Sequence, residues 1–339
     1  MSLLAGSYEK FIWGFALKTQ SQSHTLKPLF SFPSHLGPIK SVAVAGPVAA
    51  SGSADDTIKV YDLSANTEIG SLVQHSGAVT ALSFFTPASL FFPRNLVSGS
   101  EDGTVAIYDA DPFVHLKSIP AHKRGVIDLA VHPSGKLALS VGRDSCLAML
   151  NLVRGRRSFC CRMDKQASIV KFDLEGERFF MATEEKVTIH NSEDARIVCE
   201  MDCQKRVLCA SQAENNLLFT GGDDCGITSW DTLTGKAAYR IENAHSARVK
   251  GLVVLGSRLA GDALEYPFLI ASASSDGVIR VWDIRMVHKE KPYPLAETNT
   301  KSRITCLAGS SLKSSKKPLT GSNGGEGKQD GLMKDDSLI

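Results

Sequence analysis

The side chains with the most evident chemistry are a histidine, a serine and an aspartate that recur together along the chain. His245, Ser272 and Asp276 form one such set, and Trp282 follows six residues after the aspartate. These residue types could make the triad of a serine hydrolase. The same spacing returns four more times, however, and an enzyme needs only one active site. Repetition favours a structural role, in which buried polar side chains satisfy one another by hydrogen bonding.

Each set has a Ser or Thr, an Asp four residues later, and a bulky residue six residues after the Asp. The further sets are His35, Ser51, Asp55 and Tyr61; His75, Ser98, Asp102 and Tyr108; His122, Ser140, Asp144 and Leu150; and Thr220, Asp224 and Trp230, with Cys203 at the His position. A sixth, decayed copy has Glu184 at the Asp position and His190 at the Trp position. We expect His190 to lack the Ser and Asp partners.

Other chemical motifs are absent from the sequence. It contains no phosphate-binding Gly-x-x-x-x-Gly-Lys-Ser/Thr, no His-Glu-x-x-His and no nucleophile elbow. The eight cysteines have no framework spacing, and Cys199 and Cys203 have no second pair of ligands near them. Reduced thiols in an intracellular protein are favoured over disulfides or zinc. The sequence predicts a non-enzyme without metal or cofactor.

The elements that must position these residues are β-hairpins. In residues 269–283, two alternating apolar segments flank a turn at Asp276-Gly277, and the Asp and Gly both suit such a turn. Hairpins repeating every 40 or so residues are typical of stacked four-stranded sheets. Residues 4–15 and 29–32 resemble three strands of a blade, and residues 303–308 resemble a missing first strand. Sharing one sheet between the termini would remove both open edges of the ring.

The predicted fold is therefore all-β, a seven-bladed WD-repeat β-propeller over residues 1–310, its last blade closed by N-terminal strands plus a C-terminal strand. Residues 311–339 lose the periodicity and predict a disordered polar tail. The formal net charge of +2 gives no general argument for a nucleic-acid or membrane partner. No apolar stretch approaches the ~20 residues that span a bilayer, and Met1–Ala5 is too short for a signal sequence. We expect a monomeric propeller within a larger complex.

Two surfaces are candidates for binding a partner. Arg206, Arg248 and Arg303 each precede the first strand of a blade, so ring geometry predicts an arc on adjacent blades, which Lys205 and Arg143 extend. Guanidinium groups suit phosphate or an acidic peptide, but each could instead be solvated or paired with an acid such as Asp223.

The opposite face of the ring carries the second candidate. Insertions at residues 85–93 and 257–267 lie there, and the phenylalanines of the first could form an exposed patch or pack inward. The sequence leaves both readings open.

Several segments resemble one WD-repeat family in particular. The residues that carry the resemblance are 132–144, 151–156, 72–77, 5–15 and 299–307. They are similar to the PAK-interacting proteins, whose yeast counterpart is the maintenance-of-killer ribosome-assembly factor. The resemblance implies a nucleolar scaffold in large (60S) ribosomal subunit maturation that contacts rRNA or the ribosomal and assembly proteins of the pre-60S particle. It also implies an alternative, a signalling adaptor that binds and inhibits a p21-activated kinase through its regulatory segment.

Overall fold

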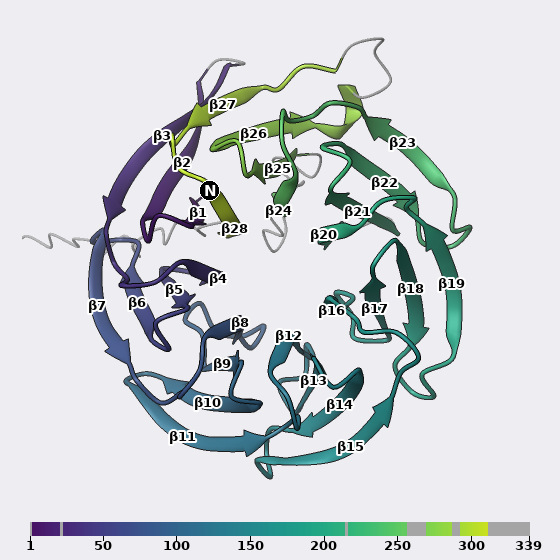
Figure 1. Ribbon diagram of the computed structural model, residues 1–339. Coiled ribbons are helices and arrows are strands. Elements are labelled where there is room, and N and C mark those ends of the chain that lie inside the picture. Colours follow the sequence, from purple (N-terminus) through teal and green to yellow (C-terminus); the bar gives the residue numbers. More distant parts are fainter. Residues whose placement is uncertain (1, 21–22, 214–215, 256–268, 287–291, 311–339) are drawn as a thin grey trace, which may run out of the picture.

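Seven four-stranded antiparallel sheets stand in a ring around a central channel (Figure 1). The computed structural model describes residues 2–20, 23–213, 216–255, 269–286 and 292–310. In these ranges the only helix is a 3-10 turn at Ile284–Met286. The predicted all-β, seven-bladed propeller is confirmed. The predicted tail, 311–339, and the insertion at 257–267 lie outside the described residues.

Blades 1 to 6 each use four consecutive strands, the first nearest the channel. Blades 1 to 3 are β4 (Ile39–Ala45), β5 (Val48–Ser53), β6 (Ile58–Asp62), β7 (Thr67–Leu72); β8 (Val79–Phe85), β9 (Asn95–Ser100), β10 (Thr104–Ala110), β11 (Phe113–Pro120); and β12 (Val126–Val131), β13 (Leu137–Gly142), β14 (Cys146–Asn151), β15 (Arg156–Arg162). Blades 4 to 6 are β16 (Ile169–Phe172), β17 (Arg178–Thr183), β18 (Lys186–Asn191), β19 (Ile197–Asp202); β20 (Val207–Gln212), β21 (Leu217–Gly222), β22 (Ile227–Asp231), β23 (Ala237–Ile241); and β24 (Val249–Leu255), β25 (Leu269–Ser274), β26 (Val278–Asp283), β27 (Ala296–Asn299). The decayed repeat is thus a complete blade, blade 4.

Blade 7 joins the two ends of the chain. Its strands, from the channel outward, are β28 (Ile304–Ser310), β1 (Ser2–Ser7), β2 (Ile12–Gln20) and β3 (Ser23–Phe32). The Thr305 hydroxyl lies 3.0 Å from the Gly6 carbonyl and 2.7 Å from the Ile39 carbonyl of blade 1, and its single proton is shared between the two acceptors. The closure predicted from the sequence is therefore confirmed, and one side chain links three strands at the seam.

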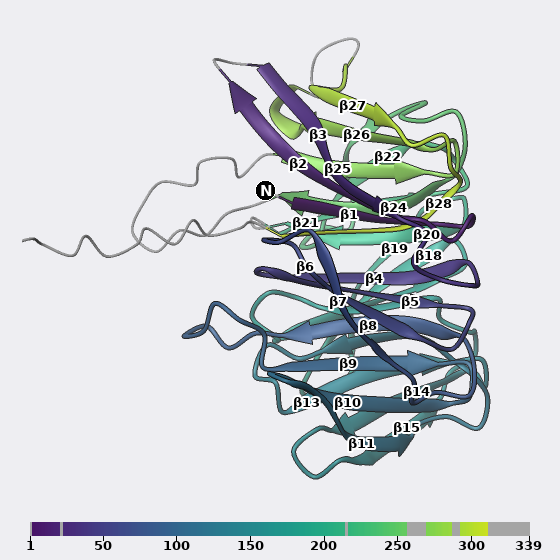
Figure 2. The ribbon, with the colours of Figure 1, turned by 90° about the vertical axis from the view of Figure 1, so that its left-hand side faces the viewer.

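The apolar core lies between blades. One cluster joins Val97 and Ile107 of blade 2 to Leu129 and Leu150 of blade 3, and the other clusters span neighbouring blades in the same way. A four-stranded sheet is apolar on both faces here, so each blade buries its faces only by stacking on its neighbours. Stacking also fixes the two faces of the ring. We call the face that bears the Asp55 and Asp276 turns the turn face, and the opposite face, which bears the β8–β9 loop, the insertion face (Figure 2).

Candidate functional site

The repeated polar side chains form a buried hydrogen-bonded chain in blade 1. His35 Nε2 lies 2.7 Å from Ser51 Oγ, which lies 2.9 Å from the Tyr61 hydroxyl. On its other side His35 Nδ1 lies 3.1 Å from Asp55 Oδ2. One proton arrangement satisfies every atom: Tyr61 donates to Ser51, Ser51 to His35, and His35 to Asp55. The chain ties the turn before β4 to the β5–β6 hairpin.

The electrostatics agree with a neutral histidine facing an ionised aspartate. Burial lowers the pKa of His35, although Asp55 opposes that shift. For Asp55 burial raises the pKa, but hydrogen bonds from Thr57 and the Leu36 amide, with His35 nearby, outweigh it and hold the pKa at about 2. A neutral histidine between a serine and a carboxylate resembles a catalytic arrangement, yet its serine is fully buried. The arrangement cannot meet a substrate in this fold.

Blades 2, 3 and 6 repeat the arrangement with small differences. The His Nε2 to Ser Oγ distances are 2.7 Å for His75 and Ser98, 2.9 Å for His122 and Ser140, and 2.8 Å for His245 and Ser272. Asp102 and Asp144 lie 3.1 and 3.0 Å from their histidines. In blade 6 the expected hydrogen bond between histidine and aspartate is not made: Asp276 lies 3.5 Å from His245, and the buried His245 Nδ1 has no hydrogen-bond partner.

The bulky residue at the end of the chain differs between these blades. The Trp282 indole donates to Ser272 at 2.9 Å, while the Tyr108 hydroxyl makes no hydrogen bond and Leu150 has no polar group to offer. Asp276 instead accepts from the amide and hydroxyl of Ser246, both at 3.0 Å. Its main role is to cap the backbone turn.

Blade 5 shows what happens when the histidine is missing. Trp230 still donates to Thr220 at 2.8 Å, but Cys203, at the histidine position, makes no hydrogen bond to Asp224. Burial raises the pKa of the Cys203 thiol to about 12, so the thiol stays neutral. Asp224 accepts instead from the exposed Arg240 at 3.1 Å. In this blade the aspartate therefore pairs with an exposed arginine in place of a buried histidine.

Blade 4 satisfies its histidine with partners that the other blades do not use. His190 is buried and has partners of its own: Nδ1 lies 3.0 Å from the Ala195 carbonyl and Nε2 lies 2.9 Å from Thr188 Oγ1. Its ring also stacks on Phe179 with centroids 4.9 Å apart. His190 lacks the Ser and Asp partners, as expected, but it is not left without hydrogen bonds.

The described residues offer little other chemistry. Within them no group of three or more His, Cys, Asp and Glu could hold a metal ion, and no helix is long and apolar enough to cross a membrane. All eight cysteines are free thiols.

The candidate surface is an arc of cations on the turn face, at one mouth of the channel. Arg206, Arg248 and Arg303 directly precede β20, β24 and β28, the inner strands of three successive blades, and all three are exposed. Lys205, beside Arg206, is exposed as well. We call Arg206, Arg248 and Arg303, together with Lys205, the arginine arc.

Lys250 lies within this arc and was missed by the sequence analysis. It lines the channel together with Lys40 and Thr305. Its pKa is lowered by burial first and then by the positive charges of Arg248, Arg303 and Arg206, with Asp223 opposing. The sequence held a signal for it: Lys250 is the second residue of β24 and follows Arg248 by two positions, so it could have been placed beside the arc.

The cations of the arc are only weakly neutralised. Arg248 Nε lies 3.6 Å from Asp223, and both side chains are more than one-third exposed, so this pair contributes little. The Arg303 guanidinium lies over the Tyr8 ring, 5.5 Å from its centroid. Arg143, by contrast, is paired with Glu101 at 2.5 Å. Arg143 is therefore more closely paired with an acid than Arg248 is.

The described insertion has mixed surroundings. Phe85 packs over Gly135 of the next blade, where a Cβ would lie 2.3 Å from its ring. Leu90 and Phe91 are exposed, at 51% and 44%, and line the wide channel mouth of the insertion face. Both open readings of this loop are therefore partly realised.

Comparisons with known proteins identify the same fold and family. The WD domain, G-beta repeat family matches residues 26–62, 66–109, 113–149 and 263–283. The human p21-activated protein kinase-interacting protein 1 is 36% identical over 317 residues, covering 91% of this chain and 76% of the relative. Shk1 kinase-binding protein 15 of Schizosaccharomyces pombe is 26% identical over 320 residues, 94% of this chain and 86% of its own. Protein MAK11 of Saccharomyces cerevisiae is 27% identical over 227 residues, 61% of this chain and 55% of its own.

Proposed function

Since the chain belongs to the family of the p21-activated protein kinase-interacting protein 1 and its WD-repeat propeller is a protein-interaction scaffold, we propose that it acts without catalysis in large ribosomal subunit biogenesis. In this proposal it docks as a monomer onto pre-60S particles in the nucleolus. The similarity to Protein MAK11 and the resemblance of residues 132–144 to the ribosome-assembly members support this role.

The observation that carries the proposal is the arginine arc. Three exposed guanidinium groups occupy equivalent positions on adjacent blades, directly before the inner strands β20, β24 and β28. Concentrated positive charge attracts the phosphates of rRNA or an acidic protein segment, and each guanidinium can bind an anion through two donors. The arc therefore gives a weakly charged protein one strongly cationic surface.

A triple charge reversal tests the arc. Arg206→Glu, Arg248→Glu and Arg303→Glu together should leave folding intact, because all three side chains are exposed. The variant should lose co-sedimentation with large-subunit precursors in a sucrose gradient. Any binding that remains should depend less steeply on salt, because fewer counterions are released.

A matched control changes the same number of charges on the insertion face. Arg94, Arg154 and Lys236 are exposed there, and their combined reversal should leave co-sedimentation unchanged. A folded arc variant that sediments like the wild type would move the binding surface away from the arc. A control variant that loses binding equally would show that net charge alone matters.

A second candidate function is that of a kinase-binding adaptor. Two relatives are named for binding a p21-activated or Shk1 kinase. Pull-down of a recombinant kinase regulatory segment by the purified propeller tests it. Stoichiometric capture that survives the arc reversal would support an adaptor with a different binding surface, and absence of capture would leave the ribosomal role alone.

A further inference from the structure

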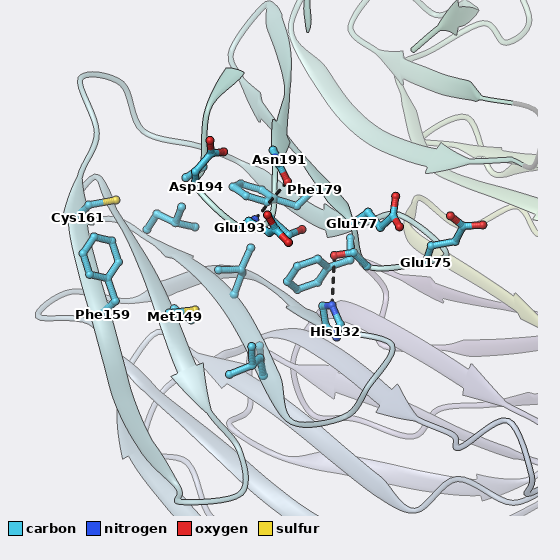
Figure 3. Close-up of a pocket in the computed structure, with 18 residues that line it drawn as sticks. His132, Met149, Phe159, Cys161, Glu175, Glu177, Phe179, Asn191, Glu193 and Asp194 are labelled. Carbon is cyan, nitrogen blue, oxygen red and sulfur yellow. Dashed lines mark hydrogen bonds between the residues drawn. The ribbon is translucent and has the colours of Figure 1, made fainter. Parts of the chain in front are cut away.

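A groove of 840 Å³ opens between blades 3 and 4 on the insertion face (Figure 3). Its floor is apolar and includes Leu139 and Met149 of blade 3 and Phe179 of blade 4. Phe159, on the outer strand β15, forms one wall and is 55% exposed. The volume lies in the range of sites that hold a ligand or several side chains of a partner.

The groove is built on fixed elements. His132 Nε2 donates to the Gly176 carbonyl at 3.2 Å, and its ring meets Phe172 edge-to-face with centroids 5.0 Å apart. These contacts tie the β12–β13 turn of blade 3 to the β16–β17 turn of blade 4. On the far side, the Ala195 carbonyl accepts from buried His190 and so holds the β18–β19 turn. Both turns that form the rim are thus anchored.

The rim is acidic. Glu175, Glu177, Glu193 and Asp194 project from the two turns of blade 4, and none of the 18 lining residues is Lys or Arg (Figure 3). Asp194 pairs with the exposed Arg196 at 3.2 Å. The three glutamates have no ion-pair partner among the described residues, and all three are exposed. Four carboxylates therefore surround an open apolar surface.

We propose that this groove binds a protein segment in which Lys or Arg alternates with large apolar side chains. The apolar residues would cover the floor, and the aliphatic stems of the basic residues would lie across it with their charged ends at the rim carboxylates. Nucleic acid is disfavoured because its phosphates would meet the glutamates. This site is opposite in charge and in position to the arginine arc, so it does not depend on the proposed function.

Selection from a library of random ten-residue peptides tests the proposal. The full-length wild-type protein serves as bait, and enriched peptides are measured by fluorescence anisotropy. We expect enrichment of peptides that combine Lys or Arg with Leu, Phe or Ile. Glu177→Lys with Glu193→Lys should weaken them at least about tenfold, because attraction becomes repulsion at two positions. Phe159→Ser should weaken them about threefold or more through lost apolar contact.

Matched variants separate the groove from general effects. Asp164→Lys with Glu185→Lys makes the same charge change on the turn face of the same blades, and Leu116→Ser removes an equally exposed apolar side chain from β11. Both should bind like the wild type, and thermal unfolding should be the same for all variants. The proposal is overturned if no peptide is enriched, if enriched peptides lack basic residues, or if the groove and control variants weaken binding equally.

Discussion

The Asp55 carboxylate accepts hydrogen bonds from several donors besides the ring of His35. The amides of Leu36 and Thr57 donate to it at 2.7 and 3.1 Å, and the Thr57 hydroxyl donates at 2.6 Å. Asp55→Ala would leave the buried His35 ring and the part-buried Thr57 amide without an acceptor. We expect it to lower the free energy of unfolding by about 1–3 kcal/mol, measured by urea denaturation.

The matched control for Asp55 is Asp224→Ala in blade 5. Asp224 accepts from the Gly226 amide at 3.3 Å and from the exposed Arg240, with no histidine behind it. Asp224→Ala should therefore lower the free energy of unfolding clearly less than Asp55→Ala does. Equal costs at the two positions would mean that the buried histidine adds nothing to the stability of the turn.

The buried histidines also predict how stability depends on pH. Burial lowers the pKa of His35, His75 and His245, the last to about 4, against an ordinary value of 6.5. Below about pH 6.5 these histidines therefore become protonated in the unfolded chain while they stay neutral in the folded protein. The neutral histidines therefore contribute their full stabilisation above pH 6.5. As the pH falls from 6.5 towards 4, the free energy of unfolding decreases by up to ~1.4 kcal/mol per pH unit for each histidine.

Urea midpoints at pH 7, 6 and 5 check this dependence. His245→Asn removes one of the titrating groups, so its midpoint should fall less steeply than that of the wild type over this range. Asp55 titrates in a separate window, below its ordinary pKa of 3.8, and does not disturb the comparison. A midpoint that stays constant from pH 7 to pH 5 would contradict a neutral buried state for these histidines.

At the scale of elements, the sequence predicts the inner hairpins best. Their alternating apolar residues and Asp-Gly turns are local signals, and even the decayed β17–β18 pair could be placed from Glu184 and His190. The partners of His190 were predictable only in part. Thr188 lies two residues from His190, and side chains two apart in a strand share a face, so this contact could be predicted. The contact with the Ala195 carbonyl depends on the conformation of the β18–β19 turn, which the sequence does not reveal.

Contacts between elements were largely beyond the sequence. Phe85 ends β8 and Phe91 lies in the loop that follows, yet Phe85 packs on Gly135 of the next blade whereas Phe91 is exposed. The groove was missed for a related reason. Met149 and Phe179 look like ordinary core residues in their own strands, and only the arrangement of blades 3 and 4 places them along a groove.

At the scale of the whole molecule, ring closure depends on a short N-terminal segment. β1 pairs with β28 across the termini, and Leu3, Ala5 and Phe15 join the core cluster between blades 7 and 6. Without β1, the inner strand β28 would have no partner strand in its own blade. An unpaired edge beside an uncovered apolar face is a site of aggregation.

Deletion of residues 1–15 tests this dependence. It removes β1 and the first part of β2, and so exposes the apolar faces that blade 7 covers on blades 6 and 1. We expect insoluble protein, or soluble protein that binds a hydrophobic dye and unfolds without cooperativity. Deletion of residues 312–339 is the control and should leave the thermal midpoint unchanged, because the last strand ends at Ser310. A soluble chain without residues 1–15 that still unfolds cooperatively would show that six blades and one strand close the ring unaided.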